Sequence, residues 1–367
     1  MSGGVDSSVT AALLQQRGYD VTGVYMKNWS QDLPGFVCPW QQDYQDAKRV
    51  AVRLGIDFKI YDFETEYRHK VVDYMVREYQ AGRTPNPDIM CNQEVKFKLF
   101  LETALADGAD LIATGHYARV KDGRLLAGLD KNKDQSYFLY RVTEEALRKS
   151  LMPIGELQKP EVRKIATKLQ LSTADKPDSQ GICFVGKVGI KEFLLAELGP
   201  QPHGPIIDQH GRQIGQHDGA IFYTIGQRHG LDVGGGLPYY VAKKDMKTNT
   251  IYVTTNLDDR NLWTKNLDLQ DLHWINGQPA TQPNTQSNES QTPQPNTQSD
   301  KGKTIRSDAA QSYQARLRHR GPLVKCALKY TPERTLLTLQ DEQRGLAASQ
   351  SAVLYAADQC LGGGIIS

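Results

Sequence analysis

The sequence predicts an α/β fold: a doubly wound parallel sheet in the first part, then a small β-rich central domain and a C-terminal β-barrel. Two observations carry this prediction. Short β-rich runs alternate with helical periodicity up to about residue 115, and short glycine-punctuated apolar runs replace that alternation from about residue 201. A chain of 367 residues has room for several domains. We therefore expect a catalytic domain over 1–200, a central domain over 201–262 and a barrel over 263–367.

The first domain is expected to contain a parallel sheet covered by helices. Strands are predicted over 21–26, 56–61 and 111–114, and helices over 44–54, over 65–81 and from Pro160 onward. Gly55 and Gly82 supply the helix stops. Ligands of such sheets bind beyond the carboxyl ends of the strands. The loops at Met26, at 82–92 and at Gly115 should therefore share one crevice.

The later domains are expected to be built from short strands. The runs 221–226, 237–241 and 251–254 predict small β units, and 324–330, 335–339 and 351–355 predict strands of a compact barrel. Between them, residues 277–304 are expected to form a disordered insertion. The hexapeptide QPNTQS occurs there twice, and Ala280 is the single aliphatic residue of 277–300, so little apolar surface can be buried.

Composition excludes several classes of protein. No charged-then-apolar leader opens the chain and no apolar run is long enough for a membrane span, so no membrane association is expected. Five cysteines are too few for a disulfide scaffold, which favours a reducing cytoplasm. The net charge of +2 does not indicate a nucleic-acid binder, but residues 301–330 contain eight basic residues and one acidic residue. That segment predicts a phosphate-binding surface, with a solvated basic face as the alternative.

The first chemical motif is the run from Ser2 to Ser8, SGGVDSS, which is followed at once by a helix-forming segment. Its glycines allow a tight turn that presents backbone N–H groups, and its serines add hydroxyl donors at a helix N-terminus. The run lacks the Gly-Lys-Ser/Thr ending of a Walker A loop. It therefore predicts an anion cradle, with a simple helix-capping turn as the alternative.

Two of the five cysteines stand in chemically distinctive surroundings. Cys91 follows a double-proline turn and is expected to open a helix, where the helix dipole, Lys96 and Lys98 would stabilise its thiolate. Asp88 is close enough in sequence for proton transfer. Cys183 lies between glycines in a loop, and such a pair suits persulfide exchange through a transient disulfide. No C-x-x-C pair occurs, so no metal site is expected; Cys38 is unassigned, and Cys326 and Cys360 are interpreted as buried packing.

Taken together, these motifs resemble the tRNA-specific 2-thiouridylase family, a member of the PP-loop ATP pyrophosphatases with an adenine nucleotide alpha hydrolase-like fold. The resemblance runs from Ser2 to the C-terminus apart from the insertion. The motifs that carry it are SGGVDSS, GVYMKNW at 23–29, AGRTPNPDIMCN at 81–92, ATGHYAR at 113–119, KDQSYFLY at 133–140 and GICFVG at 181–186.

The resemblance implies an ATP-dependent sulfurtransferase that forms 2-thiouridine at the wobble position of tRNA. ATP, with Mg²⁺, would be held by Ser2, Gly3, Gly4, Val5, Asp6, Ser7, Ser8, Met26 and Gly115. Cys183 would carry a persulfide received from a sulfur-relay donor protein, Cys91 would be the second catalytic cysteine and Asp88 an acid–base group. The residues implied to contact tRNA are Asn86, Pro87, Asp88, His116, Lys133, Asp134, Gln135, Arg316, Leu317 and Gln350.

The sequence also departs from the family pattern. Gln180 stands where relatives usually have Thr, and Leu317 stands in place of an aromatic residue after Arg316. Relatives place a hydrophobic strand before the SGGVDSS loop, whereas Met1 alone precedes it here. Either a short N-terminal segment is missing from the sequence or the sheet lacks its central strand, and we favour a truncation or misplaced start, because losing a buried strand would expose two strand edges. We expect a chain beginning at Met1 to fold poorly or to bind ATP weakly. The alternatives are another PP-loop enzyme acting on tRNA, such as a lysidine synthase, and a non-catalytic RNA-binding adaptor.

Overall fold

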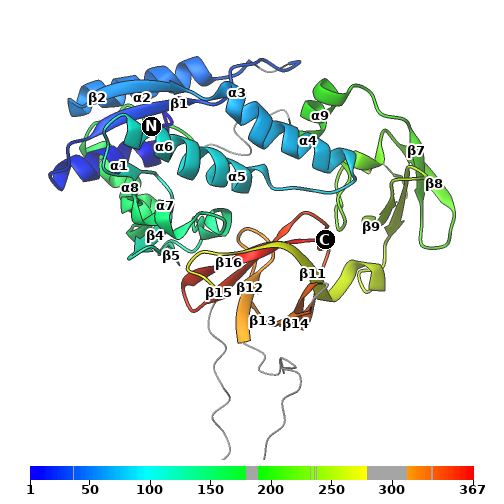
Figure 1. Ribbon diagram of the computed structural model, residues 1–367. Coiled ribbons are helices and arrows are strands. Elements are labelled where there is room, and N and C mark those ends of the chain that lie inside the picture. The colour runs from blue at the N-terminus through cyan, green and yellow to red at the C-terminus, as the bar shows by residue number, and fades with distance from the viewer. Residues whose placement is uncertain are drawn as a thin grey trace, which may run out of the picture.

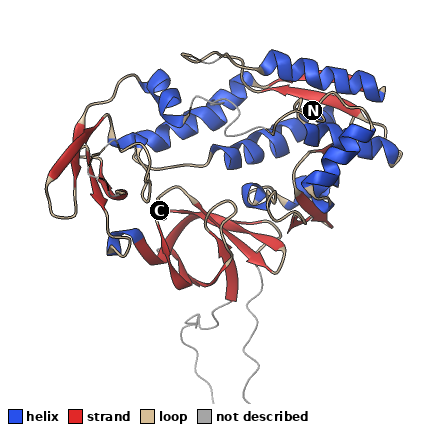
Figure 2. Cartoon of the chain, turned by 180° about the vertical axis from the view of Figure 1, so that it is seen from behind, coloured by secondary structure: helices blue, strands red, loops and turns tan. Residues whose placement is uncertain are grey.

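A computed structural model describes residues 1–35, 37–178, 189–231, 233–234, 236, 238–278, 312–331 and 334–367. Figure 1 shows a helical N-terminal part above a β-barrel, with a smaller sheet to one side of both. Figure 2 shows from behind that helices dominate the first part and strands the other two. Within the described residues, no helix is both long and apolar enough to cross a membrane.

The N-terminal part alternates strands and helices as predicted. Its helices are α1 (Val5–Gln16), α2 (Trp40–Leu54), α3 (Glu64–Tyr67), α4 (Asp73–Gln80), α5 (Pro87–Met90), α6 (Phe100–Ala106), α7 (Glu144–Arg148), α8 (Lys159–Lys168) and α9 (Ile190–Leu198). Its strands are β1 (Thr22–Lys27), β2 (Asp57–Asp62), β3 (Ile112–Ala113), β4 (Ala118–Lys121), β5 (Arg124–Ala127) and β6 (Ser150–Leu151). Gly55 ends α2 in the left-handed conformation, as expected for a helix stop.

The parallel strands form two separate pairs in the described part of the chain. β1 pairs with β2 in parallel, with Met26 opposite Tyr61, and β3 pairs with β6 in parallel. The strand alternation is confirmed, and among the described residues no strand joins the two pairs, as expected for a sheet without its central strand.

Helices α1 and α8 pack against each other and fix the N-terminal loop. Val5 and Val9 of α1 share a buried cluster with Val162 and Ala166 of α8. α8 begins with a capping box, in which Gln158 and Glu161 satisfy each other's backbone N–H groups, and Pro160 occupies its first turn. The helix predicted from Pro160 is therefore confirmed.

One long helical segment runs from Pro87 to Ala106. Asn86 caps its start, and α5 continues through the π-helical residues Cys91–Leu99 into α6. A similar π-helical turn, Arg68–Val72, joins α3 to α4 within the helix predicted over 65–81. π-Helical turns are rare and often occur at functional sites.

The central part is a four-stranded sheet of β7 (Gly204–Ile207), β8 (Gln213–His217), β9 (Tyr240–Asp245) and β10 (Thr250–Thr254) in the order β8–β7–β10–β9. Ile206, Val241 and Ile251 are fully buried in its core. The strand predicted over 221–226 is wrong, because Ala220–Phe222 form a 3₁₀ turn. Ala220 of this turn and Tyr223, which follows it, pack into the core.

The C-terminal part is a closed barrel. Its strands are β11 (Trp263–Trp274), β12 (Ser312–Arg316), β13 (Val324–Tyr330), β14 (Thr335–Arg344), β15 (Ser351–Ala356) and β16 (Gln359–Ile366). They follow the order β11–β14–β13–β12–β15–β16, and β11 also pairs with β16. The hairpin β4–β5 of the N-terminal part extends this sheet, because Leu125 and Leu126 pair with Cys360 and Gln359. The barrel is therefore joined to the N-terminal part by backbone hydrogen bonds.

Candidate functional site

The loop before α1 has the geometry of an anion cradle. Gly3 has a φ of +72°, and a Cβ there would lie 2.3 Å from the Asp43 carbonyl oxygen, so a larger residue does not fit. Ser7 Oγ accepts a hydrogen bond from the Ser2 backbone N–H at 3.0 Å, and Ser8 Oγ donates to the Gly4 carbonyl at 2.8 Å. Among the described residues, no side chain caps the start of α1, which begins after Gly4. The helix N-terminus is therefore open toward an anion.

Gly115 brings the loop after β3 against the first turn of α1. A Cβ at Gly115 would lie 2.8 Å from the Ser7 backbone nitrogen and 2.9 Å from the Asp6 carbonyl carbon. Glycine is required here because two backbone segments touch. Met26, the other residue expected on the adenosine side, lies half-buried in β1.

Asp6 is the charged residue of the loop and is held by partners that sequence reasoning missed. The Tyr117 hydroxyl donates to Asp6 Oδ1 at 2.9 Å, and Lys159 Nζ donates to both carboxylate oxygens at 2.7 and 2.9 Å. Lys159 is 153 residues away in sequence, so no local pattern could link the two. Tyr117 carries a local signal, because it lies two residues after Gly115 in the same motif.

Cys91 lies within the helix, not at its start. The Asn86 side chain caps the helix by accepting from the Asp88 backbone N–H at 3.1 Å, and Pro87 occupies the first turn. Cys91 is therefore one turn inside, and its side chain is buried among the residues of the catalytic core. The predicted thiolate stabilisation by a helix N-terminus is wrong, because the helix dipole acts on the first turn. Lys98 is engaged elsewhere, with its Nζ 3.5 Å from Glu94.

Asp88, Lys96 and His116 form one electrostatic group beside Cys91. Burial raises the pKa of Asp88, and the charge of Lys96 opposes that shift. Burial lowers the pKa of His116 well below its ordinary value, and Lys96 lowers it further. His116 Nδ1 lies 2.9 Å from Thr114 Oγ1, and its ring packs 5.7 Å from that of Phe97. The group thus combines a neutral imidazole with a carboxyl group whose proton affinity is increased.

The second sulfur-transfer residue cannot be placed, because Cys183, Gln180 and the whole GICFVG motif lie outside the described residues. The Cys91–Cys183 pairing stays a prediction. Cys326 and Cys360 are buried free thiols whose burial raises the pKa to about 12. Their interpretation as packing residues agrees with this, since a thiol so rarely ionised is a poor nucleophile. Cys38 is half-buried, and burial raises its pKa as well.

Several residues expected to contact tRNA are engaged within the protein. Lys133 Nζ lies 2.6 Å from Asp178, and Gln135 Oε1 accepts from the Tyr117 backbone N–H at 2.9 Å. Asp134 is buried and accepts from Arg316 Nη1 at 2.6 Å. Leu317 is buried in the barrel core. The backbone carbonyl of Gln350 accepts a hydrogen bond from the Ile366 backbone N–H. Their tRNA contacts stay predictions, which require a rearranged side chain at Lys133 and Arg316.

Side chains that could bind a metal ion do not cluster in the part of the chain that the structure describes. Over the described ranges, no group of three or more His, Cys, Asp or Glu side chains is arranged to hold a metal ion.

Comparison with known proteins covers the whole chain. Residues 1–187 match the model of a tRNA methyl transferase HUP domain, 191–255 a tRNA methyl transferase PRC-barrel domain and 264–366 an aminomethyltransferase beta-barrel domain. The chain is 45% identical over 372 residues to tRNA-specific 2-thiouridylase MnmA of Neisseria meningitidis serogroup C, covering 100% of this chain and 94% of the relative. It is 42% identical over 376 residues to the MnmA of Streptococcus sanguinis, covering 100% and 93%.

A solved structure, a predicted subunit of tRNA methyltransferase from Methanocaldococcus jannaschii, is 19% identical, covers 46% of this chain and 73% of its own, and has a TM-score of 0.31.

Proposed function

The chain belongs to the tRNA-specific 2-thiouridylase family, and from this premise we propose that it replaces the C2 oxygen of the wobble uridine of tRNA with sulfur at the expense of ATP. One observation supports the proposal most strongly. Gly115 contacts the first turn of the anion-binding loop, and the next residue, His116, belongs to the group formed with Asp88 and Lys96. The nucleotide loop and the proposed base-binding site are therefore adjacent in space.

The ATP loop supplies the activation step. Uracil O2 is a poor leaving group. When O2 attacks the α-phosphorus of ATP, pyrophosphate is released and the base becomes adenylated at O2. The adenylated oxygen can then depart as AMP. The residues proposed to hold ATP are Ser2 to Ser8, Met26 and Gly115, through backbone N–H groups and serine hydroxyls at the open N-terminus of α1. Mg²⁺ would screen the phosphate charge. It would arrive with the phosphates, and Asp6, the carboxylate of the loop, would be the protein group that contributes to holding it.

The cysteines supply the sulfur transfer. The outer sulfur of a persulfide on Cys183, received from a donor protein, would attack C2 as AMP leaves. Cys91 would then attack the Cys183 sulfur, which breaks the S–S bond, leaves the outer sulfur on C2 and forms a Cys91–Cys183 disulfide. Alternatively, Cys91 would release sulfide first and the sulfide would attack C2. A reducing cytoplasm would return the disulfide to thiols.

The Asp88 group is proposed to handle protons around the target base. Burial raises the pKa of Asp88, which makes its carboxylate a better proton acceptor, and neutral His116 can hydrogen-bond the base without repelling a cationic neighbour. The base must leave its stack to reach them, which costs less in a loop than in a duplex.

Product analysis tests this function. The purified protein, unmodified tRNA, ATP with Mg²⁺ and a persulfide donor should give AMP, pyrophosphate and 2-thiouridine in the nucleoside digest. In a parallel reaction with free lysine in place of the persulfide donor, AMP formation with a lysine-containing nucleoside would instead indicate a lysidine-synthase-like enzyme. Absence of tRNA-dependent AMP would indicate a non-catalytic RNA-binding adaptor.

A further inference from the structure

Lys159 links the nucleotide loop to a second carboxylate. Its Nζ lies 2.7 and 2.9 Å from the two oxygens of Asp6 and 2.8 Å from Asp178. The side chain is only 11% exposed, and Nζ lies 5.6 Å from the centre of the Tyr117 ring. A lysine this buried must stay paired, so an anion has to face it at all times.

The surroundings of Lys159 contain several paired charges. Asp178 also accepts from Lys133 Nζ at 2.6 Å and from Arg163 Nη2 at 2.8 Å. Three cations thus lie near the carboxylates of Asp6 and Asp178, and Asp130 adds a third carboxylate, whose Oδ2 accepts from the Lys159 backbone N–H at 2.9 Å. Burial would raise the pKa of Asp178, but hydrogen bonds from Lys133 and Lys159 outweigh it and hold that pKa at about 2. Asp178 is therefore ionised at neutral pH, and the Lys159 ammonium group is shared between Asp178 and Asp6 of the loop.

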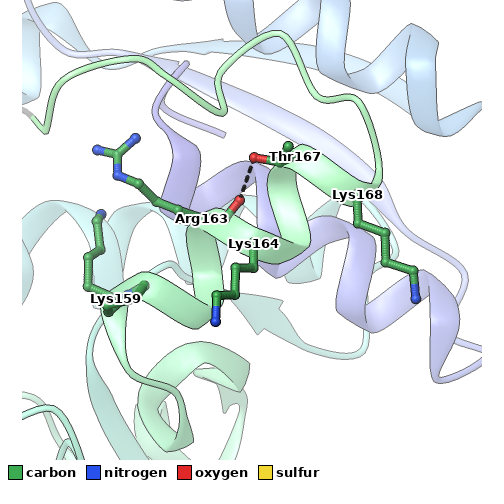
Figure 3. Close-up of a pocket in the computed structure, with 6 residues that line it drawn as sticks. Lys159, Arg163, Lys164, Thr167 and Lys168 are labelled. Atoms are coloured by element: carbon green, nitrogen blue, oxygen red, sulfur yellow. Dashed lines mark hydrogen bonds between the residues drawn. The ribbon is translucent and has the colours of Figure 1, made fainter.

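The fold fixes Lys159 in this position. It is the first residue of α8, whose Val162 and Ala166 are buried against α1. Thr173, just after α8, donates from Oγ1 to Ser8 Oγ at 3.0 Å. Figure 3 shows Lys159 and Arg163 directed to the same side of α8, whereas Lys164 and Lys168 point elsewhere.

The basic groove on α8 is a different feature. It has a volume of about 750 Å³ and is lined by Lys159, Pro160, Arg163, Lys164, Thr167 and Lys168, all from one helix. A surface bounded by one helix does not enclose a nucleotide. The groove does offer a matched control, because Lys164 is an exposed lysine of the same helix that lies in it without facing Asp6.

We propose that Lys159 binds the phosphate groups of ATP, exchanging its contacts with Asp6 and Asp178 for phosphate oxygens when the nucleotide enters. This inference rests on the proposed function, because it assumes that ATP is the ligand of the loop. The two carboxylates hold the buried ammonium group in place while the site is empty, and Asp178 competes with ATP for it. Lys159 would then bind phosphate oxygens through its side chain, as the loop does through its backbone N–H groups.

Binding measurements with ATP and with adenosine test this assignment. Calorimetric titration of the full chain with ATP should show a dissociation constant raised about tenfold or more in Lys159→Met, since a charge-assisted hydrogen bond is lost. Adenosine affinity should stay within about twofold of wild type, Lys159→Arg should recover part of the ATP affinity, and Lys164→Met should bind ATP as wild type does.

A second variant gives an effect of opposite sign. Asp178→Asn keeps the size of the side chain and removes the competing charge, so ATP should bind about two- to fivefold more tightly. A purely structural role for the cluster predicts weaker binding instead. If circular dichroism shows that Lys159→Met does not fold, the ATP affinity of Asp178→Asn alone tests the role of Lys159.

The outcomes separate this inference from the proposed function. A wild-type chain that binds no ATP would overturn both. A wild-type chain that binds ATP, with Lys159→Met binding it equally well or losing ATP and adenosine in the same proportion, would overturn the role of Lys159 only.

Discussion

Arg316 Nη1 lies 2.6 Å from Asp134 Oδ2, and this ion pair joins β12 of the barrel to the N-terminal part. The side chain of Asp134 is 3% exposed and that of Arg316 is 15% exposed. Asp134 also accepts from the backbone N–H groups of Gly128 and Ser136, and the Arg316 guanidinium stacks 5.0 Å from the Tyr355 ring. The pair therefore lies inside the interface that the β5–β16 pairing creates.

Removing Arg316 should destabilise the protein, because Asp134 would stay buried without its partner. We expect Arg316→Ala to lower the free energy of unfolding by about 3 kcal/mol. Urea unfolding followed by circular dichroism measures this. The double variant Arg316→Ala with Asp134→Asn should recover part of the loss, and Lys325→Ala, an exposed lysine of β13, should change stability by less than about 0.5 kcal/mol. An Arg316→Ala protein as stable as wild type would show that the pair contributes nothing.

The phosphate-binding role predicted for the basic C-terminal segment is better tested at its exposed lysines. Lys325 and Lys329 are exposed on β13. Replacing either by alanine should weaken tRNA binding and reduce the slope of log K against log salt by about 1, without changing ATP affinity. Filter binding at several salt concentrations provides the slopes. Slopes equal to that of wild type would favour the solvated basic face.

His116 should make stability depend on pH. Its pKa in the folded state is well below 6.5, so the unfolded chain binds a proton that the folded chain does not. The free energy of unfolding should therefore fall as pH drops below about 6.5. The variant His116→Gln should flatten this part of the curve relative to His69→Gln, which changes an exposed histidine. Parallel curves for the wild type and His116→Gln would contradict the buried neutral imidazole.

Gly115 should be essential for the nucleotide loop because of its backbone contact. A methyl group there would press on the Ser7 nitrogen and the Asp6 carbonyl carbon and displace the first turn of α1. We expect Gly115→Ala to weaken ATP binding about tenfold or more. The matched control is Gly234→Ala, since a Cβ at Gly234 meets nothing within 4 Å. Equal ATP affinity of the two variants would show that Gly115 is not part of the ATP-binding site.

Local patterns predicted the local structure of this chain well. The strand at Thr22–Lys27, the helix stop at Gly55 and the barrel strand Val324–Tyr330 follow from periodicity and glycine placement. Long-range relationships could not be predicted in the same way. The strand pairing of Leu125 with Cys360 and the contact of Lys159 with Asp6 join residues far apart in sequence.

Two errors have physical causes. A helix start at Cys91 was expected, although proline suits the first turn of a helix and Pro87 begins it here. A strand was expected over 221–226 because its residues are β-rich, yet Ala220–Phe222 form a 3₁₀ turn and Tyr223 after it packs into the core of the central sheet. In both cases a neighbouring element, a cap or a core, determined the structure.

Sulfur transfer by Cys91 and Cys183 is the central claim, and thiolation of unmodified tRNA by single-cysteine variants tests it most directly. Wild type, Cys91→Ser, Cys183→Ser and the control Cys38→Ser would be incubated with tRNA, ATP and a persulfide donor, and 2-thiouridine measured by mass spectrometry of the nucleosides. We predict that Cys91→Ser and Cys183→Ser form no 2-thiouridine, whereas Cys38→Ser forms it at close to the wild-type rate. Near-normal product from Cys91→Ser or from Cys183→Ser would contradict the catalytic role of that cysteine.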